Sequence, residues 1–358
     1  MRLPIARNNS EAPDFSIRPS RCDYHVSMAI KLDVRTLTVE LPTRTGWVRP
    51  VNEVSFRLRE GETLGIVGES GCGKTMLALA LMGLTPPGAR RTGEAWLHPS
   101  LPHGAQGNRS NLIVACEAEM RTLRGREISM IFQEPMTALN PVLRVGQQIE
   151  EAIRIHEPRL ARREIQPRVL EAIARAAIPE PARRAHQYPH QMSGGLRQRA
   201  LIAMALAAGP GVLIADEPTT ALDVTVQKQI LDLLEVLRRD LKLSLLFIAH
   251  DLGIINQIAD QVAVMYAGRI VEQGPVGEVL RHPRHPYTEG LLRAQPRLRR
   301  EKLESIPGAV PALEALPPGC AFAPRCSRRV PECEARMPDL IEPRGAVESH
   351  RARCILVV

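Results

Sequence analysis

Residues 63–75 read Thr63-Leu64-Gly65-Ile66-Val67-Gly68-Glu69-Ser70-Gly71-Cys72-Gly73-Lys74-Thr75. The first part is a short apolar run of strand type, and the part from Gly68 onward has the pattern G-x-x-x-x-G-K-[ST]. Residues 76–84 are strong helix formers, and Pro86-Pro87 ends them. This order of strand, glycine-rich loop and helix predicts a phosphate-binding loop, and a chance glycine-rich turn explains it poorly.

The chemistry of this loop depends on each of its parts. Glycines let backbone N–H groups close around phosphate oxygens, and the helix N-terminus adds a favourable field. We expect the Lys74 ammonium to reach the β- and γ-phosphates of a nucleotide and the Thr75 hydroxyl to ligate Mg²⁺. The predicted phosphate-binding residues are Gly68, Glu69, Ser70, Gly71, Cys72, Gly73, Lys74, Thr75 and Met76.

Two further apolar runs end in side chains suited to hydrolysis. Residues 212–215 predict a buried parallel strand that delivers Asp216 and Glu217 at its C-terminal end, where open α/β sheets bind ligands. We expect Asp216 to hold the Mg²⁺ shell and Glu217 to act as the base that orients the attacking water. Residues 245–249 predict a second strand that ends at His250, within reach of the γ-phosphate in a parallel sheet.

A second candidate anion site begins at Ser193. Ser193, Gly194 and Gly195 precede an Ala/Leu/Met-rich segment of helical composition, so Ser193 can cap that helix beside two flexible glycines. An ordinary capped helix is the alternative interpretation. If both elements bind phosphate, two such chains arranged head to tail would each complete the other's site.

Across roughly residues 30–275 these motifs resemble those of the ABC ATPase family, in the order usual for that family. Six motifs carry the resemblance: Walker A at 68–75, the Q-loop at Gln133, the signature at 193–199, Walker B at 212–217, the D-loop at Asp223 and the switch histidine at His250.

The resemblance implies ATP as the nucleotide and ATP hydrolysis as the activity. ATP would lie between the phosphate-binding loop of one subunit and Ser193, Gly194, Gly195 and Asp223 of another. Gln133 would contribute to the Mg²⁺ site, with Thr75 and Asp216, and would sense both the nucleotide and a membrane partner. The expected catalytic residues are Glu217, His250 and Gln133.

Two positions depart from the family's pattern. Leu196 replaces the commonest signature Gln, but the peptide importers that the chain resembles often have an apolar residue there, and catalysis should survive the change. The aromatic residue that stacks on adenine in the family is missing near Leu41, and Trp47 lies close but out of clear register. The second departure puts adenine stacking, and strict preference for ATP over GTP, in question.

Three sequence segments resemble those of dipeptide, oligopeptide and nickel importers in particular: Leu123-Arg124-Gly125, residues 135–141 and His285-Pro286-Tyr287-Thr288. That group implies a heterodimer of two ATPase subunits beneath two membrane permease subunits, fed by an external solute-binding protein. The chain would then lie peripherally on the cytoplasmic face of the cell inner membrane. Peptide is the first expected solute, and nickel or another small solute is the alternative.

The C-terminal region carries four cysteines, Cys320, Cys326, Cys333 and Cys354, with the spacing C-x5-C-x6-C-x20-C. Four thiolates match the ligand count of a [4Fe–4S] cluster, and the spacing differs from the paired C-x2-C of zinc ribbons. The importer subfamily carries a similar tail. A structural iron–sulfur cluster is the first expectation, with zinc or free thiols as alternatives.

Composition restricts the class of protein. The longest uncharged apolar stretch, residues 200–215, is interrupted by Gly209-Pro210-Gly211 and is too short to span a bilayer. Residues 1–28 lack the apolar centre of a signal peptide and are expected to be a disordered extension, with Met28 as an alternative start. The net charge of +8 is compatible with nucleic acid, but only 3% of residues are aromatic, which disfavours single-strand binding.

These patterns predict an α/β P-loop fold of the ABC ATPase type with a mixed sheet. We expect a nucleotide-binding domain at 29–274, a helical subdomain inserted at about 134–192, and a cysteine-rich C-terminal extension at 275–358. The main rival is a soluble ABC ATPase acting on nucleic acid or ribosomes. Such proteins usually carry two ATPase cassettes, and only one set of motifs is present here, so no nucleic-acid partner is expected.

Overall fold

The computed structural model describes residues 29–44, 46–99, 109–133, 138–220, 222–295, 305–343 and 349–357. The expected N-terminal extension lies outside these ranges. Within them, no helix is both long enough and apolar enough to cross a membrane.

The central sheet is mixed, as the sequence predicts, and its described strands have the order β11-β10-β9-β3-β8-β7-β6. Strands β6, β7, β8, β3 and β9 run parallel, while β10 is antiparallel to β9 and β11 to β10. The bounds are β3 Thr63–Val67, β6 Ile128–Ile131, β7 Val212–Asp216, β8 Ser244–Ala249, β9 Gln261–Tyr266, β10 Arg269–Pro275 and β11 Arg351–Ala352. Every residue of β3, β7 and β8 is buried, which explains their uninterrupted apolar runs.

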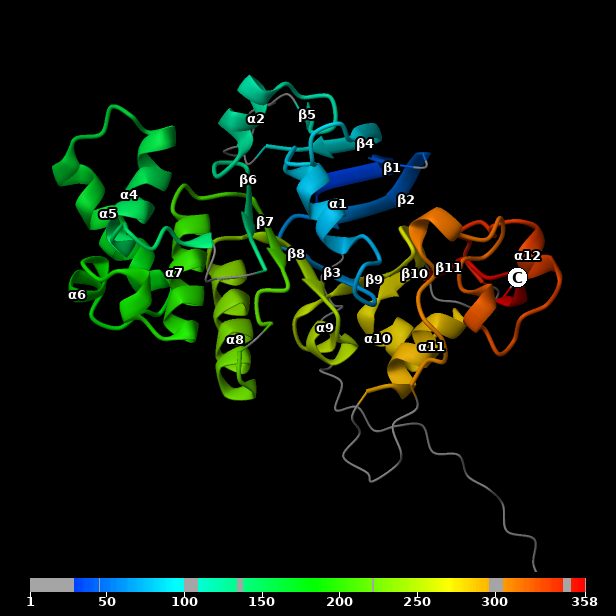
Figure 1. Ribbon diagram of the computed structural model, residues 1–358. Helices are drawn as coiled ribbons and strands as arrows, with labels where there is room; N and C mark the ends of the chain where they lie inside the picture. The colour runs from blue at the N-terminus through cyan, green and yellow to red at the C-terminus, as the bar shows by residue number, and fades with distance from the viewer. Residues whose placement is uncertain are drawn as a thin grey trace, which may run out of the picture.

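A second, antiparallel sheet has the order β2-β1-β4-β5 and lies above the central sheet in Figure 1. Its strands are β1 Ile30–Thr43, β2 Gly46–Arg59, β4 Arg90–Leu97 and β5 Ser110–Asn111. One hydrophobic core, which contains Leu32, Leu77 and Ile214, joins this sheet and helix α1 (Lys74–Leu81) to one face of the central sheet. Helix α1 ends earlier than its composition suggests, because Gly83 takes a left-handed φ of 66°.

The opposite face of the central sheet is covered by helices. These are α8 Val224–Asp240, α9 Leu252–Ile258, α10 Val276–Arg281 and α11 Pro286–Arg293. A second core, with Leu213, Phe247 and Leu234 among its members, fills the space between these helices and the sheet. Leu213 and Ile214 thus belong to different cores, as alternation along a strand requires. The carboxyl ends of the parallel strands are left free to carry a site.

A helical group forms the left part of the molecule in Figure 1. It contains α4 Val145–His156, α5 Arg162–Arg175, α6 Pro181–Ala185, the short η1 Pro189–Gln191 and α7 Gly194–Leu206. Its members share a third core that includes Ile149, Ile165 and Leu201. Helix α2 (Glu117–Leu123) lies apart, beside β5.

The C-terminal segment, which comprises the described residues 305–343 and 349–357, lies on the right in Figure 1, next to β10. It contains short turns of helix rather than long elements: η2 Leu313–Ala315, η3 Ala323–Arg325, α12 Glu332–Ala335 and η4 Ile355–Val357. Phe322 packs against Tyr266 and Tyr287 with ring centroids 5.4 Å from each. This aromatic cluster, together with the pairing of β11 with β10, attaches the segment to the sheet.

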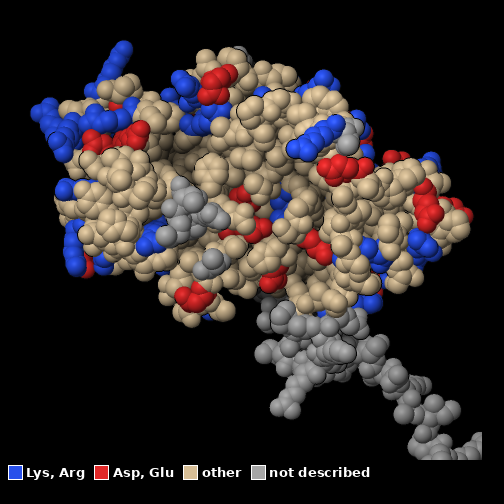
Figure 2. All heavy atoms as spheres, viewed as in Figure 1, with Lys and Arg blue, Asp and Glu red and all other residues tan. Residues whose placement is uncertain are grey.

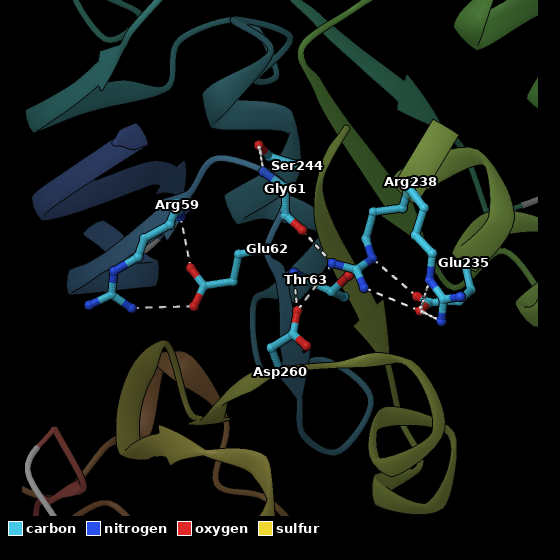
Figure 3. A network of polar contacts seen from close by, with 9 residues as sticks. Arg59, Gly61, Glu62, Thr63, Glu235, Arg238, Ser244 and Asp260 are labelled. Atoms are coloured by element: carbon cyan, nitrogen blue, oxygen red, sulfur yellow. Dashed lines mark hydrogen bonds and ion pairs between the residues drawn. The ribbon is translucent and has the colours of Figure 1, made fainter. Parts of the chain in front are cut away.

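The start of β3 is fixed by a polar network shown in Figure 3. Arg238 of α8 donates to the Gly61 carbonyl and to Glu235, and its Nη1 lies 3.5 Å from Asp260 Oδ2. Asp260 in turn accepts the Thr63 N–H at 2.9 Å. Because β3 leads into the glycine-rich loop, this network sets where the loop begins.

We expect Arg238→Ala to lower the free energy of unfolding by about 2 kcal/mol, because it removes the nearly buried cation that bridges Glu235 and Asp260. Arg239→Ala is the matched control: Arg239 pairs with the same Glu235, but its side chain is 55% exposed. Its loss should cost at most about 0.5 kcal/mol. Denaturant unfolding of both variants measures the difference, and equal losses would mean that the network does not stabilise this corner.

Candidate functional site

The glycine-rich loop lies between the end of β3 and the start of α1. Lys74 begins the helix, and its Nζ donates to the carbonyl oxygens of Gly68 at 2.7 Å and Glu69 at 3.1 Å. The Lys74 side chain is only 5% exposed. Its ammonium is therefore held over the loop, in the position from which it can turn to an anion bound by the loop's N–H groups.

Two glycines of this loop have no room for a side chain. A Cβ on Gly73 would lie 1.8 Å from the Pro50 carbonyl oxygen, and the residue has a φ of 105°. A Cβ on Gly68 would lie 2.1 Å from the Met265 carbonyl oxygen. The loop is thus packed against β2 and β9, and its shape depends on glycine at both positions.

Asp216 ends β7 directly beside the loop. It is 1% exposed, it hydrogen-bonds Thr75, and its Oδ1 has no hydrogen-bond partner. Burial raises the pKa of this carboxyl, and the neighbouring Glu217 raises it further, while Thr75 and Lys74 oppose the shift. A buried carboxylate oxygen without a partner, next to a hydroxyl, is the donor set that Mg²⁺ prefers, so these residues fit the metal.

Glu217 stands at the centre of the site. Its N–H donates to the Ile248 carbonyl at 3.0 Å, and its φ is 46°, a left-handed conformation that costs energy outside glycine. Its carboxylate accepts from Gln133 Nε2 and Thr220 Oγ1, each at 3.1 Å. His250 Nδ1 lies 3.7 Å and Lys74 Nζ 3.8 Å from the same carboxylate.

The structure therefore brings together, around Glu217, side chains that are far apart in the sequence. Lys74, Gln133 and His250 are all sequence-predicted site residues, and they approach one carboxylate. Thr220 was not predicted. Its position three residues after Glu217 in a tight turn, where its N–H donates to the Glu217 carbonyl at 3.1 Å, was the available signal. Figure 2 shows carboxylate and cationic side chains together in the hollow at the centre of this face.

The signature residues occupy a different place, at the start of α7. Ser193 caps the helix by accepting the Leu196 N–H at 3.4 Å. Asp223 caps α8 in the same way, by accepting the Val226 N–H at 2.9 Å. Both side chains are exposed. Figure 1 places α7 and α8 to the left of β3 and α1, so the two anion-seeking elements of the chain are carried by separate parts of the fold.

Comparison with known proteins agrees with this geometry. A family model described as ABC transporter matches residues 51–220, and one described as oligopeptide/dipeptide transporter, C-terminal region, matches residues 271–333. A protein of Brucella ovis named as a peptide import ATP-binding protein is 50% identical over 332 residues, which is 90% of this chain and 96% of that protein. The chain belongs to the ABC transporter family.

Other relatives of this ABC protein support the same assignment. A peptide import ATP-binding protein of Brucella abortus is 46% identical over 309 residues, 86% of this chain and 90% of that protein. Among solved structures, cbiO1 from Clostridium perfringens, part of the ABC transporter complex cbiONQ, has a TM-score of 0.56 at 26% identity, with 71% of this chain and 92% of that chain covered. A dimeric ATP-binding cassette bound to ADP and phosphate has a TM-score of 0.59 at 24% identity, covering 68% and 98%.

These comparisons confirm the predicted P-loop fold, and the chain is an ABC-type ATPase that binds ATP. Leu41 and Trp47, the two residues considered for adenine stacking, both lie at the β1–β2 hairpin. Leu41 pairs with Val48 across the β1–β2 hairpin and is partly buried. Trp47 is 43% exposed, and the Arg90 guanidinium covers its ring at 3.9 Å.

The four cysteines of the ABC ATPase's C-terminal segment lie near one another. The Cys320 N–H donates to the Cys333 carbonyl at 2.8 Å. The pKa of the Cys320 thiol is raised to about 11, mainly by burial, and the neighbouring Cys333 and Cys354 contribute to this rise. The pKa of the Cys354 thiol is also raised, mainly by burial and in addition by Cys326 and Cys333. Even so, in the described ranges no three or more Cys, His, Asp or Glu side chains are arranged to hold a metal ion.

Proposed function

We propose that the residues gathered around Glu217 hydrolyse ATP. The loop from Gly68 to Thr75 binds the phosphates, with Lys74 on the β- and γ-phosphates. Thr75, Asp216 and Gln133 would hold Mg²⁺, which would supply positive charge beside the phosphates. The observation that carries this proposal is the convergence of Lys74, Gln133 and His250 on one carboxylate at the edge of the loop.

In this reaction Glu217 accepts a hydrogen bond from the attacking water and takes its proton. The water oxygen forms the new bond to the γ-phosphorus, and the bond from that phosphorus to the bridging oxygen breaks. ADP leaves with the bridging oxygen and its electron pair. His250 steadies the γ-phosphate, while Thr220 and Gln133 keep the Glu217 carboxylate in place.

A complete site requires a second ATPase subunit. Ser193, Gly194, Gly195 and Asp223 lie at exposed helix starts on another part of the fold, and they would meet ATP bound by a partner's loop. Ser193 and Gly194 are exposed, so the start of α7 is accessible to a ligand. The partner is a homologous but different ABC ATPase, which makes the assembly a heterodimer.

The energy of hydrolysis drives import of dipeptides or oligopeptides. Support comes from the match of residues 271–333 to the C-terminal region of oligopeptide/dipeptide transporters and from the names of the Brucella relatives. The chain acts on the cytoplasmic face of the inner membrane, attached to two permease subunits that receive solute from an external binding protein. In this arrangement residues 29–274 form the nucleotide-binding domain, residues 134–192 its helical subdomain and residues 275–358 the extension.

Uptake by vesicles containing the whole complex tests this function. We expect ATP-dependent accumulation of a labelled oligopeptide in the presence of the binding protein, and none with the Glu217→Gln chain. If the vesicles accumulate nickel and not peptide, the ATPase role stands, and nickel is the solute in place of peptide. Retention of ribosomes or nucleic acid by the purified chain, without permease subunits, would contradict the transport role.

The cysteines of the C-terminal segment are proposed to bind a [4Fe–4S] cluster, with zinc as the alternative metal. The support is the count of four cysteines in one segment, which matches the ligand count of such a cluster, and the burial of two of them, Cys333 and Cys354. We expect anaerobically purified protein to contain iron and acid-labile sulfide, and Cys333→Ser to lose both. Cys116→Ser is the control, because Cys116 is exposed and lies outside the segment. Zinc without sulfide would identify the alternative, and absence of both metals would mean free thiols.

A further inference from the structure

The phosphate-binding loop contains an acidic residue, Glu69, whose negative charge disfavours the binding of phosphate by this loop. A carboxylate among N–H groups that bind phosphate repels the nucleotide unless another charge compensates it. The structure supplies that charge from the C-terminal segment. Arg325 donates to Glu69 through both ends of its guanidinium, Nη1 to Oε2 at 2.6 Å and Nη2 to Oε1 at 3.1 Å.

Arg325 is itself held in a fixed position. Its side chain is 4% exposed, and its Nε donates to the Pro307 carbonyl at 2.9 Å. Further bonds reach the Ile306 carbonyl at 3.4 Å and the Tyr266 hydroxyl at 3.4 Å. A guanidinium fixed on several sides loses little further freedom when it binds a carboxylate, which favours the two-bond contact with Glu69.

The backbone of Glu69 is held from the same side. Its N–H donates to the Tyr287 hydroxyl at 2.8 Å. Tyr287 belongs to α11, is fully buried, and packs on Tyr266 and Phe322. One loop residue is thus fixed through both its amide and its carboxylate by residues that lie outside the match to the ABC transporter model and inside the match to the importer C-terminal region.

We propose that Arg325 is a positioning residue for ATP binding, which neutralises the Glu69 carboxylate and keeps it turned away from the phosphates. The C-terminal segment would then be part of the nucleotide site and would determine its affinity for ATP. This inference rests on the proposed assignment of the loop as the phosphate site. It predicts that the contribution of Arg325 acts through the charge of Glu69.

The test is the dissociation constant of Mg-ATP for the full-length chain, with thermal unfolding measured in parallel. We expect Arg325→Ala to weaken ATP binding about tenfold, the size of one charge-assisted contact, while kcat at saturating ATP changes little. Adding Glu69→Gln to Arg325→Ala should recover most of the affinity, because the uncompensated charge is gone. The affinity lost in Arg325→Ala should also shrink as salt is raised.

Arg328→Ala is the matched control, because Arg328 pairs with Glu289 in the same region and has a half-exposed side chain. Its ATP affinity should equal that of the wild type. Two results would overturn the inference: unchanged affinity in Arg325→Ala, or a loss that follows lowered thermal stability and is not recovered by Glu69→Gln. Failure of the wild type to bind ATP would instead contradict the proposed nucleotide site.

Discussion

Lys74→Ala is expected to weaken ATP binding by at least about 100-fold, or about 2.7 kcal/mol. The ammonium is nearly buried and lies between the loop carbonyls and the Glu217 carboxylate, so no other described cation replaces it at that point. Its removal leaves the phosphates facing Asp216 and Glu217 without the nearest compensating charge. Titration with a fluorescent ATP analogue measures the loss.

Lys228→Ala controls for the general loss of a positive charge, because Lys228 is an exposed residue of α8. This variant should bind ATP as the wild type does. Thermal unfolding without nucleotide should show that Lys74→Ala remains folded. ATP affinity retained in folded Lys74→Ala would mean that the nucleotide binds elsewhere on the chain.

Glu217→Gln should leave ATP binding intact and lower kcat by about 1,000-fold. Glutamine has the same shape and can still accept from Gln133 and Thr220, so the surrounding hydrogen bonds are preserved. It has no negative charge and cannot take a proton from water. Phosphate release measures the loss of turnover, and size-exclusion chromatography with ATP should show the variant accumulating as an ATP-bound dimer with its partner subunit.

Thr220→Val separates catalysis from positioning. It removes one hydrogen bond to Glu217 at 3.1 Å and leaves the carboxylate itself in place. We expect it to lower kcat by only about tenfold. A loss as large as that of Glu217→Gln would mean that the orientation of Glu217, and not its charge, limits the reaction.

Much of the fold was accessible from the sequence because its main strands are short and continuously apolar. The runs at 63–67, 212–215 and 245–249 correspond to β3, β7 and β8, and each delivers its polar residues at the carboxyl end. The antiparallel sheet formed by β1, β2, β4 and β5 was not predicted. Its register includes bulges within β1, and such pairing depends on partners that are distant in the chain.

The limits of sequence interpretation are clearest at Glu69. Its place in the loop marked it as a phosphate-binding residue, whereas its carboxylate contacts Arg325, which lies 256 positions away. Long-range contacts of this kind leave no periodicity or motif in the sequence. The cysteines show a second limit: their number and spacing predicted a [4Fe–4S] cluster, but in the described residues they are not arranged to hold a metal ion.

Steady-state ATP turnover by the complete transporter, measured as Mg²⁺ and solute are varied, tests the central claim most directly. The arrangement of Lys74, Asp216 and Glu217 predicts saturable hydrolysis that requires Mg²⁺, rises with peptide and its binding protein, and disappears in the Glu217→Gln chain. Turnover that is absent from the complete wild-type complex, or that persists unchanged in Glu217→Gln, would contradict it.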